Sequence, residues 1–331
     1  MIYIYAEDFF HMYSIGIDLG GTNIAVGIVD ENYKIVKKGS CPTLAQRPAE
    51  EIVRDMVTLC KRLCEETGSD IRDLHGTGIA CPGTVNPDTG IVEYANNIKF
   101  FDFPLVELFS KYSGIEKSKI KIGNDANLAA FGEAVAGAAR GTSSSVTITL
   151  GTGVGSGIII DGKMLTGCAH GGAEIGHTVI VKDGRPCTCG RRGCFEVYCS
   201  ATALIAETKK KFLQRPDSLM YEMCDGDVNR VGGKTAFAAM RKGDEAAGEV
   251  VSEYLGYLAC GIANILNVFQ PEVLCIGGGV SGERENLLRP LLPLIEKEIY
   301  SKDGKLHTDV RIAELGNDAG IIGAAAVAMN K

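Results

Sequence analysis

A pattern of strand, glycine turn and strand occurs twice in this chain, and it restricts the fold more than any other feature. The two copies read SIGIDLGGTNIAVGIVD and VTITLGTGVGSGIIID. Runs rich in β-branched residues on both sides of a glycine bend are typical of a β-hairpin. Without a gap, the copies share five positions, where Ile17, Leu19, Gly20, Ile28 and Asp30 recur as Ile148, Leu150, Gly151, Ile159 and Asp161. Because each copy opens about half of the chain, the pattern predicts two related domains.

The rest of the sequence alternates strand-like and helix-like segments. Strands are expected near 34–38, 76–80, 119–122 and 272–276, and helices near 50–66, 126–139, 244–269 and 283–300. Gly141 is expected to close the helix at 126–139. This mixture predicts an α/β fold with two sheets facing each other across a cleft. We place an N-terminal α/β domain at 12–122 and a C-terminal α/β domain at 123–331, with the last helix a candidate to pack back on the N-terminal domain.

Charge and composition exclude several classes of partner. The formal net charge is -7 and no cluster of lysine or arginine forms a basic face, so neither nucleic acid nor an anionic membrane is expected. No apolar run approaches the ~20 residues that span a bilayer. The start, MIYIYAEDFFHMYS, lacks the features of a secretory signal, which predicts a cytoplasmic protein with reduced cysteines. Residues 1–11 are either a loose tail or a wrongly assigned start.

The glycine turns are candidate phosphate-binding sites. Successive backbone N–H groups in such turns form nests that bind anions. Two facing nests, at 20–22 and 151–153, could hold a triphosphate, and the alternative is that both are ordinary hairpin turns. The GGKT stretch at 232–235 is not a P-loop, because Val228 stands where the first glycine is required. GGGVSG at 277–282 lacks the acidic residue of a dinucleotide site but leaves open a platform for a nucleotide base or ribose.

Asp125 is the candidate catalytic carboxylate. It lies in the stretch Asn124 to Asn127, where a predicted strand ends and a helix begins, which is the usual location of catalytic groups in open α/β sheets. A general base there could take a proton from a substrate hydroxyl during phosphoryl transfer. The alternative is that Asp125 only caps its helix, since Asp and Asn are preferred N-caps.

Three cysteines and one histidine form a candidate metal site. His177 is followed by Cys187, Cys189 and Cys194, and four such ligands are the set that closes a structural zinc site. Free surface thiols are the alternative. The same segment carries Glu174 and Glu196, whose carboxylates could accept hydrogen bonds from a polyhydroxylated ligand or could be solvated surface charges.

These residues together resemble the ROK family of bacterial sugar kinases. The resemblance runs from about Tyr13 to the C-terminus and rests on six motifs, namely DLGGTN at 18–23, GNDAN at 123–127, LGTGVGSG at 150–157, ExGH at 174–177, CxCGxxGCxE at 187–196 and GGG at 277–279. The family implies an actin-like, ribonuclease H-like ATPase fold that closes over ATP, Mg²⁺ and a sugar.

The resemblance also implies a role for each matching residue. Asp125 would be the base, and His177 would ligate zinc with one ring nitrogen and face the sugar with the other. The implied sugar contacts are Gly83, Asn97, Asn124, Asp125, Glu174, His177 and Glu196, with Asn96 the alternative to Asn97. The implied phosphate contacts are Asp18, Gly20, Gly21, Thr22, Asn23, Thr152 and Gly153, and Gly278 and Gly279 would lie beside the adenosine.

The expected activity is transfer of the γ-phosphate of ATP to the 6-hydroxyl of glucose. Kinases of N-acetylmannosamine, N-acetylglucosamine, fructose or mannose share nearly all these motifs and stay open. A non-catalytic sugar sensor is the alternative of another class, although the presence of Asp125 argues against it. We also expect a homo-oligomer, either a dimer or a tetramer.

Overall fold

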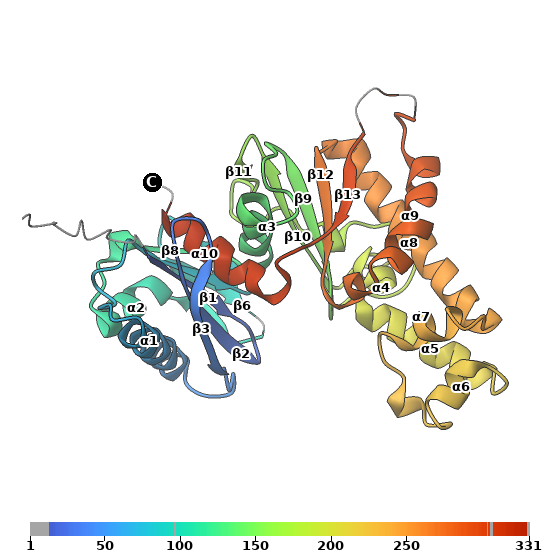
Figure 1. The fold of residues 1–331 in the computed structure, drawn as a ribbon, viewed down its shortest axis with the longest axis horizontal. Helices are drawn as coiled ribbons and strands as arrows, with labels where there is room; N and C mark the ends of the chain where they lie inside the picture. The colour runs from blue at the N-terminus through green and yellow to red at the C-terminus, as the bar shows by residue number, and fades with distance from the viewer. Residues whose placement is uncertain (1–12, 96, 303, 305–306, 330–331) are drawn as a thin grey trace, which may run out of the picture. The chain divides into compact units, whose positions relative to one another are not determined.

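The computed structural model describes residues 13–95, 97–302, 304 and 307–329. The predicted tail at 1–11 and Met12 lie outside these residues. The described chain forms two compact units, the first within Met1–Ala136 and Asn317–Lys331 and the second within Gly137–Gly316 (Figure 1). This division differs from the sequence-based boundary after residue 122, because the helix that begins at Asp125 packs within the first unit.

The first unit is built on a five-stranded sheet with the order β3-β2-β1-β4-β8. Its strands are β1 (Ser14–Leu19), β2 (Asn23–Val29), β3 (Ile35–Pro42), β4 (Thr77–Cys81) and β8 (Ile120–Asn124). Strands β1 and β2 form an antiparallel pair, which confirms the predicted hairpin, whereas β1, β4 and β8 run parallel. A smaller sheet contains β5 (Thr84–Asn86), β6 (Ile91–Ala95) and β7 (Phe100–Phe103).

Helices cover both faces of the first sheet. Because side chains alternate along a strand, Ile15 and Ile17 of β1 point to the face that packs with α1 (Ala49–Glu66) and α2 (Leu105–Ser113). Gly16 points to the other face, where a Cβ would overlap a carbonyl of α10 (Ala319–Met329). α10 also packs against α3 (Asp125–Ala136), where a Cβ on Gly323 would overlap the carbonyl oxygen of Leu128. Glycines therefore allow the last helix to lie directly on the sheet and on α3.

The second unit repeats the strand order and directions of the first. Its sheet has the order β11-β10-β9-β12-β13, with β9 antiparallel to β10 and parallel to β12. The strands are β9 (Ser145–Leu150), β10 (Val154–Ile160), β11 (Lys163–Met164), β12 (Val273–Gly277) and β13 (Asp309–Ile312). Its helices are α4 (Glu196–Cys199), α5 (Ala201–Gln214), α6 (Leu219–Met223), α7 (Thr235–Met240), α8 (Glu245–Phe269) and α9 (Glu285–Glu298).

The internal repeat holds without a gap in the first strand of each hairpin and shifts in the second. Leu19 pairs with Ile24 across the first turn, but Leu150 pairs with Val154 across the second. The second turn is therefore one residue shorter, and Ile28 corresponds to Ile158 rather than to the Ile159 of the gapless match. The burial patterns of the strands support this alignment. The patterns of β1 and β9 are identical, whereas those of β2 and β10 match only after a shift of one residue.

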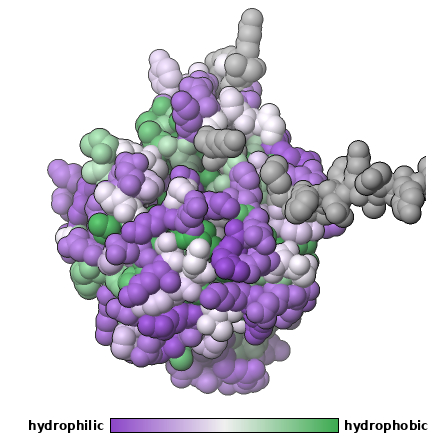
Figure 2. Space-filling view, turned by 90° about the vertical axis from the view of Figure 1, so that its left-hand side faces the viewer, coloured by the Kyte–Doolittle hydropathy of each residue, from purple (hydrophilic) through white to green (hydrophobic). Residues whose placement is uncertain are grey.

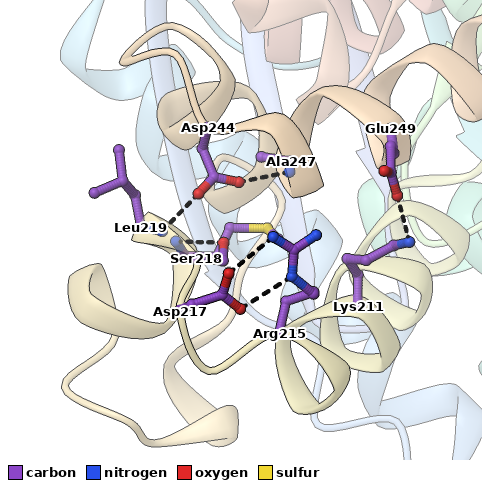
Figure 3. A network of polar contacts seen from close by, with 9 residues as sticks. Lys211, Arg215, Asp217, Ser218, Leu219, Asp244, Ala247 and Glu249 are labelled. Atoms are coloured by element: carbon purple, nitrogen blue, oxygen red, sulfur yellow. Dashed lines mark hydrogen bonds and ion pairs between the residues drawn. The ribbon is translucent and has the colours of Figure 1, made fainter.

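A polar network fixes the start of the long helix α8 (Figure 3). One oxygen of Asp244 accepts the N–H of Ala247 in α8 at 2.7 Å, and the other accepts the N–H of Leu219 at the start of α6 at 2.6 Å. Ser218 caps α6 as well, by accepting the N–H of Met220. Two helix N-termini thus depend on one carboxylate, which ties the start of α6 to the start of α8.

The surface is largely polar on the side drawn in Figure 2, where hydrophilic residues dominate and hydrophobic ones form small separate areas. Within the described part of the chain, no helix combines the length and the apolar character needed to cross a membrane.

Candidate functional site

Two aspartates meet at one edge of the first sheet. Strands β1, β4 and β8 are parallel, so their carboxyl ends share that edge. Asp18 is the penultimate residue of β1, and Asp125 follows β8 directly as the first residue of α3. Burial, together with the nearby charge of Asp125, raises the pKa of Asp18 to about 6. Burial also raises the pKa of Asp125, which the hydrogen bonds it accepts partly oppose.

Asn124, and not Asp125, caps the helix. The Asn124 Oδ1 accepts the backbone N–H of Asn127 at 3.1 Å, which is the hydrogen bond of an N-cap. Its Nδ2 donates to the carbonyl oxygen of Gly83 at 3.1 Å. Asp125 accepts the N–H of Ala126 at 2.8 Å with one oxygen, Oδ1. The capping role that sequence left open for Asp125 is therefore filled by its neighbour.

The structure brings the other predicted residues of the first unit close to this edge. Gly83 has a φ of 90°, and a Cβ there would overlap the carbonyl oxygen of Tyr94 in β6, so this position requires glycine. Asn97 is exposed and packs beside the first glycine turn, since a Cβ on Gly21 would lie 3.1 Å from the Cβ of Asn97. Asn96, the alternative to Asn97, lies outside the described residues.

The first glycine turn is held by a residue that the sequence analysis missed. Thr43 follows β3 and is fully buried. Its hydroxyl donates to the carbonyl oxygen of Gly20 at 2.6 Å, and its N–H donates to the carbonyl oxygen of Thr22 at 2.8 Å. No motif marks Thr43, because its partners are about twenty residues earlier in the chain and only the fold brings them together.

In the second unit, His177 and three cysteines form a compact cluster. All four ligand atoms lie within 4.8 Å of one another. The Cys189 and Cys194 sulfurs are 3.7 Å apart, and the Cys187 sulfur is 3.6 Å from His177 Nδ1. A tetrahedral zinc ion would need about 3.8 Å between two sulfurs and about 3.6 Å between sulfur and nitrogen, from ordinary zinc bond lengths. The donor set and its spacing therefore fit zinc.

The loop that carries the cluster is anchored to the body of the second unit. Phe195 is fully buried, and its ring packs so closely on Gly261 of α8 that a Cβ there would overlap it. Within the loop, the N–H of Cys187 donates to the carbonyl oxygen of Arg191 at 2.9 Å, and the guanidinium of Arg191 donates to the carbonyl oxygen of His177 at 3.2 Å.

Glu196 links the cluster to the second glycine turn. Its Oε2 accepts the N–H of Val154 at 3.0 Å, its Oε1 lies 3.9 Å from the Cys187 sulfur, and a Cβ on Gly153 would overlap its carboxylate. Val154 also packs its carbonyl against Gly176, immediately before His177. The structure thus gathers Gly153, His177 and Glu196 around the start of β10.

The remaining predicted residues of the second unit lie near His177 in the chain or near the second glycine turn in the sheet. Glu174 is exposed, and its carbonyl oxygen accepts the N–H of His177 at 3.1 Å. Thr152 is exposed in the second glycine turn. Gly278 has a φ of 81° and packs against the backbone of Leu150, whereas a Cβ on Gly279 would meet only open space. Because β9 and β12 are parallel, these two glycines share a sheet edge with the second turn.

Comparisons with known proteins agree over nearly the whole chain. The glucokinase of Thermotoga maritima is 35% identical over 95% of this chain and 96% of its own length, and that of Halalkalibacterium halodurans is 38% identical over 93% and 92%. The crystal structure of a ROK family glucokinase from Streptomyces griseus in complex with glucose and AMPPNP matches with a TM-score of 0.80 and 34% identity, over 95% of this chain and 98% of that one. More distantly, the xylose repressor of Bacillus subtilis is 26% identical over 96% of this chain and 77% of its own length.

These matches identify the fold and the family. The two units have the actin-like two-domain sugar kinase fold of the ROK glucokinase structures. The model of the family described as ROK family matches residues 14–331. The predicted resemblance is confirmed, and the chain belongs to the ROK family.

Proposed function

We propose that this protein is an ATP-dependent kinase that transfers the γ-phosphate of ATP to the 6-hydroxyl of glucose. The observation that carries the proposal is the partly buried Asp125 carboxyl, which stands beside Asn124 at the carboxyl edge of the parallel strands. Relatives named glucokinase, at 33% to 38% identity over nearly the full chain, favour glucose over the other sugars.

Asp125 would act as the general base. Burial raises the pKa of its carboxyl, and a base with a raised pKa takes a proton from a hydroxyl more readily. The hydrogen bond from Ala126 to Oδ1 orients the carboxylate. Bound ATP and Mg²⁺ would supply the phosphoryl group and neutralise the charge that develops on it. The protein itself would contribute orientation and proton removal.

The remaining proposed site residues supply binding. The sugar hydroxyls would be bound by Gly83, Asn97, Asn124, Glu174, His177 and Glu196. The phosphates of ATP would be bound by Asp18, Gly20, Gly21, Thr22, Asn23, Thr152 and Gly153, and the adenosine by Gly278 and Gly279. The open space beside Gly279 and the exposure of Thr152 support the nucleotide part of this assignment.

We assign the cluster of His177, Cys187, Cys189 and Cys194 to a structural zinc ion. Four protein ligands fill a tetrahedral site and leave no position for a reacting water. Because Glu196 follows Cys194 by two residues, zinc would fix the backbone from which that carboxylate projects. The protein is further proposed to be a homo-oligomer, which sedimentation velocity would test.

The proposal is tested by following ADP release over a panel of glucose, mannose, fructose, N-acetylmannosamine and N-acetylglucosamine. Glucose should give the highest kcat/KM, and ³¹P NMR should place the phosphate on its 6-hydroxyl. A higher value for another sugar would reassign the substrate. Absence of ADP release with every sugar, together with retained sugar binding, would instead favour a sugar sensor, a role consistent with the more distant similarity to xylose repressors.

A further inference from the structure

Thr43 controls the direction of the peptide groups in the first glycine turn. It binds the carbonyl oxygens of Gly20 and Thr22 from one side, at 2.6 Å and 2.8 Å. In a trans peptide the C=O of one residue and the N–H of the next point in opposite directions. The N–H groups of Gly21 and Asn23 therefore point away from Thr43. A pair of N–H groups turned to one side is the arrangement that binds an anion.

Thr43 is itself anchored to a helix. The guanidinium of Arg47 donates to the carbonyl oxygen of Thr43 at 3.0 Å and pairs with the carboxylate of Asp55 at 2.6 Å. Asp55 belongs to α1, which packs on the first sheet. The glycine turn is thus connected to helix α1 through Thr43 and Arg47, so its orientation does not depend on the residues of the turn alone.

The second glycine turn has an equivalent restraint of different chemistry. Gly151 occupies the position of Gly20 in the repeat, and its carbonyl oxygen accepts the N–H of Ala201, the first residue of α5, at 2.8 Å. The N–H of Thr152 consequently points away from α5. In the first unit a hydroxyl holds the carbonyl of Gly20, and in the second unit a helix N–H holds the corresponding carbonyl of Gly151. Because two different donors fix equivalent carbonyl groups, we infer that the orientation of the turn itself is required.

We propose that Thr43 is a positioning residue that holds the first glycine turn in the orientation that binds the phosphates of ATP. This inference rests on the proposed function, because it takes the turn as part of the nucleotide site. Thr43 would act through the N–H groups of Gly21 and Asn23.

The test compares Thr43→Val with Thr43→Ser. Valine keeps the shape but removes the hydroxyl, so KM for ATP and Kd for AMPPNP should each rise about tenfold, the effect of one lost hydrogen bond. KM for glucose should stay within about twofold of the wild-type value, because other residues are proposed to bind the sugar. Serine restores the donor and should return KM for ATP close to the wild-type value.

Thr208→Val is the matched control. Thr208 is also fully buried, and its hydroxyl donates to a backbone carbonyl, that of Leu204, at 2.7 Å. It lies inside α5, seven residues after the Ala201 N–H that holds the second turn. This variant should lose a similar amount of stability, measured as Tm, without a change in KM for ATP. An equal rise in KM for ATP in both variants would overturn the proposal, because it would reflect general loosening.

Two further outcomes separate this inference from the proposed function. Wild-type protein that binds no AMPPNP would overturn both. Wild-type protein that binds AMPPNP, with an unchanged Kd in folded Thr43→Val, would overturn only the role of Thr43. If Thr43→Val does not fold, Arg47→Met replaces it, and a KM for ATP that is unchanged in that variant would likewise overturn the role.

Discussion

The carboxyl groups of Asp18 and Asp125 are neighbours at one edge of the first sheet, and the charge of Asp125 adds to burial in raising the pKa of Asp18 to about 6. Asp18 also faces the first turn of α10, where a Cβ on Gly320 would lie 2.7 Å from its Oδ2. Two partly buried carboxyl groups next to each other reduce the stability of the folded state once they are ionised. Arrangements of this kind are common at functional sites.

Replacing Asp125 with asparagine tests its role as a base. Asp125→Asn keeps the size of the side chain but removes its ability to take a proton, so kcat should fall at least about 100-fold. Glucose affinity, measured by calorimetry, should change little. Asp70→Asn, an exposed aspartate paired with Arg72, serves as the control and should keep full activity. Substantial turnover by Asp125→Asn would remove Asp125 as the base.

Asp18→Asn should stabilise the protein at neutral pH while it impairs catalysis. The folded-state pKa of about 6 exceeds the ordinary value of 3.8, so the folded form binds more protons between these values and stability falls as pH rises through them. Above pH 6 the full penalty applies, at most about 3 kcal/mol from a shift of about two units. Urea unfolding at pH 8 should therefore favour the variant. The difference should disappear near pH 3, and a less stable variant at pH 8 would contradict the assignment.

Cys189→Ser should lower zinc content and Tm together. Removing one of four ligands weakens a structural zinc site, and the free energy of metal binding is part of the free energy of folding. Metal analysis and thermal unfolding measure the two effects, and glucose binding should weaken because the loop of Glu196 loses its anchor. Cys168→Ser is the control, since Cys168 is exposed like Cys189 but lies outside the cluster. Active wild-type protein without zinc would disprove the metal assignment.

Gly323→Ala and Gly256→Ala should change stability in opposite directions. Both glycines lie inside helices, but a Cβ on Gly323 would overlap the Leu128 carbonyl, whereas a Cβ on Gly256 in α8 would meet nothing within 4 Å. Forcing α10 away from α3 should cost about 1–3 kcal/mol. Alanine at 256 should instead add up to about 1 kcal/mol through helix propensity. Chemical unfolding of both variants measures the contrast, and equal effects would show that α10 can shift freely.

Local features of the sequence were predictable, and most long-range ones were not. The helix expected at 244–269 is found at Glu245–Phe269, because Asp244 caps it and Pro271 follows it. The prediction that Gly141 closes its helix was wrong, because α3 ends at Ala136. Gly141 lies in the turn beyond, with a φ of 87°. That helix packs against α10, which is nearly two hundred residues away in sequence. This packing also places α3 within the first unit, whereas Thr43 was missed because its partners lie about twenty residues earlier and only the fold brings them together.

The shorter second turn has a consequence for any attempt to exchange the halves of this protein. A strand transplanted from one hairpin to the other by copying residue numbers would arrive with its inner and outer side chains reversed. Ile159 would then occupy the position of Ile28, whose structural counterpart is Ile158, and each side chain of the strand would meet the packed layer on the wrong face of the sheet. Chimaeras of the two hairpins must therefore be aligned by hydrogen-bond partner, with one residue deleted or inserted at the bend.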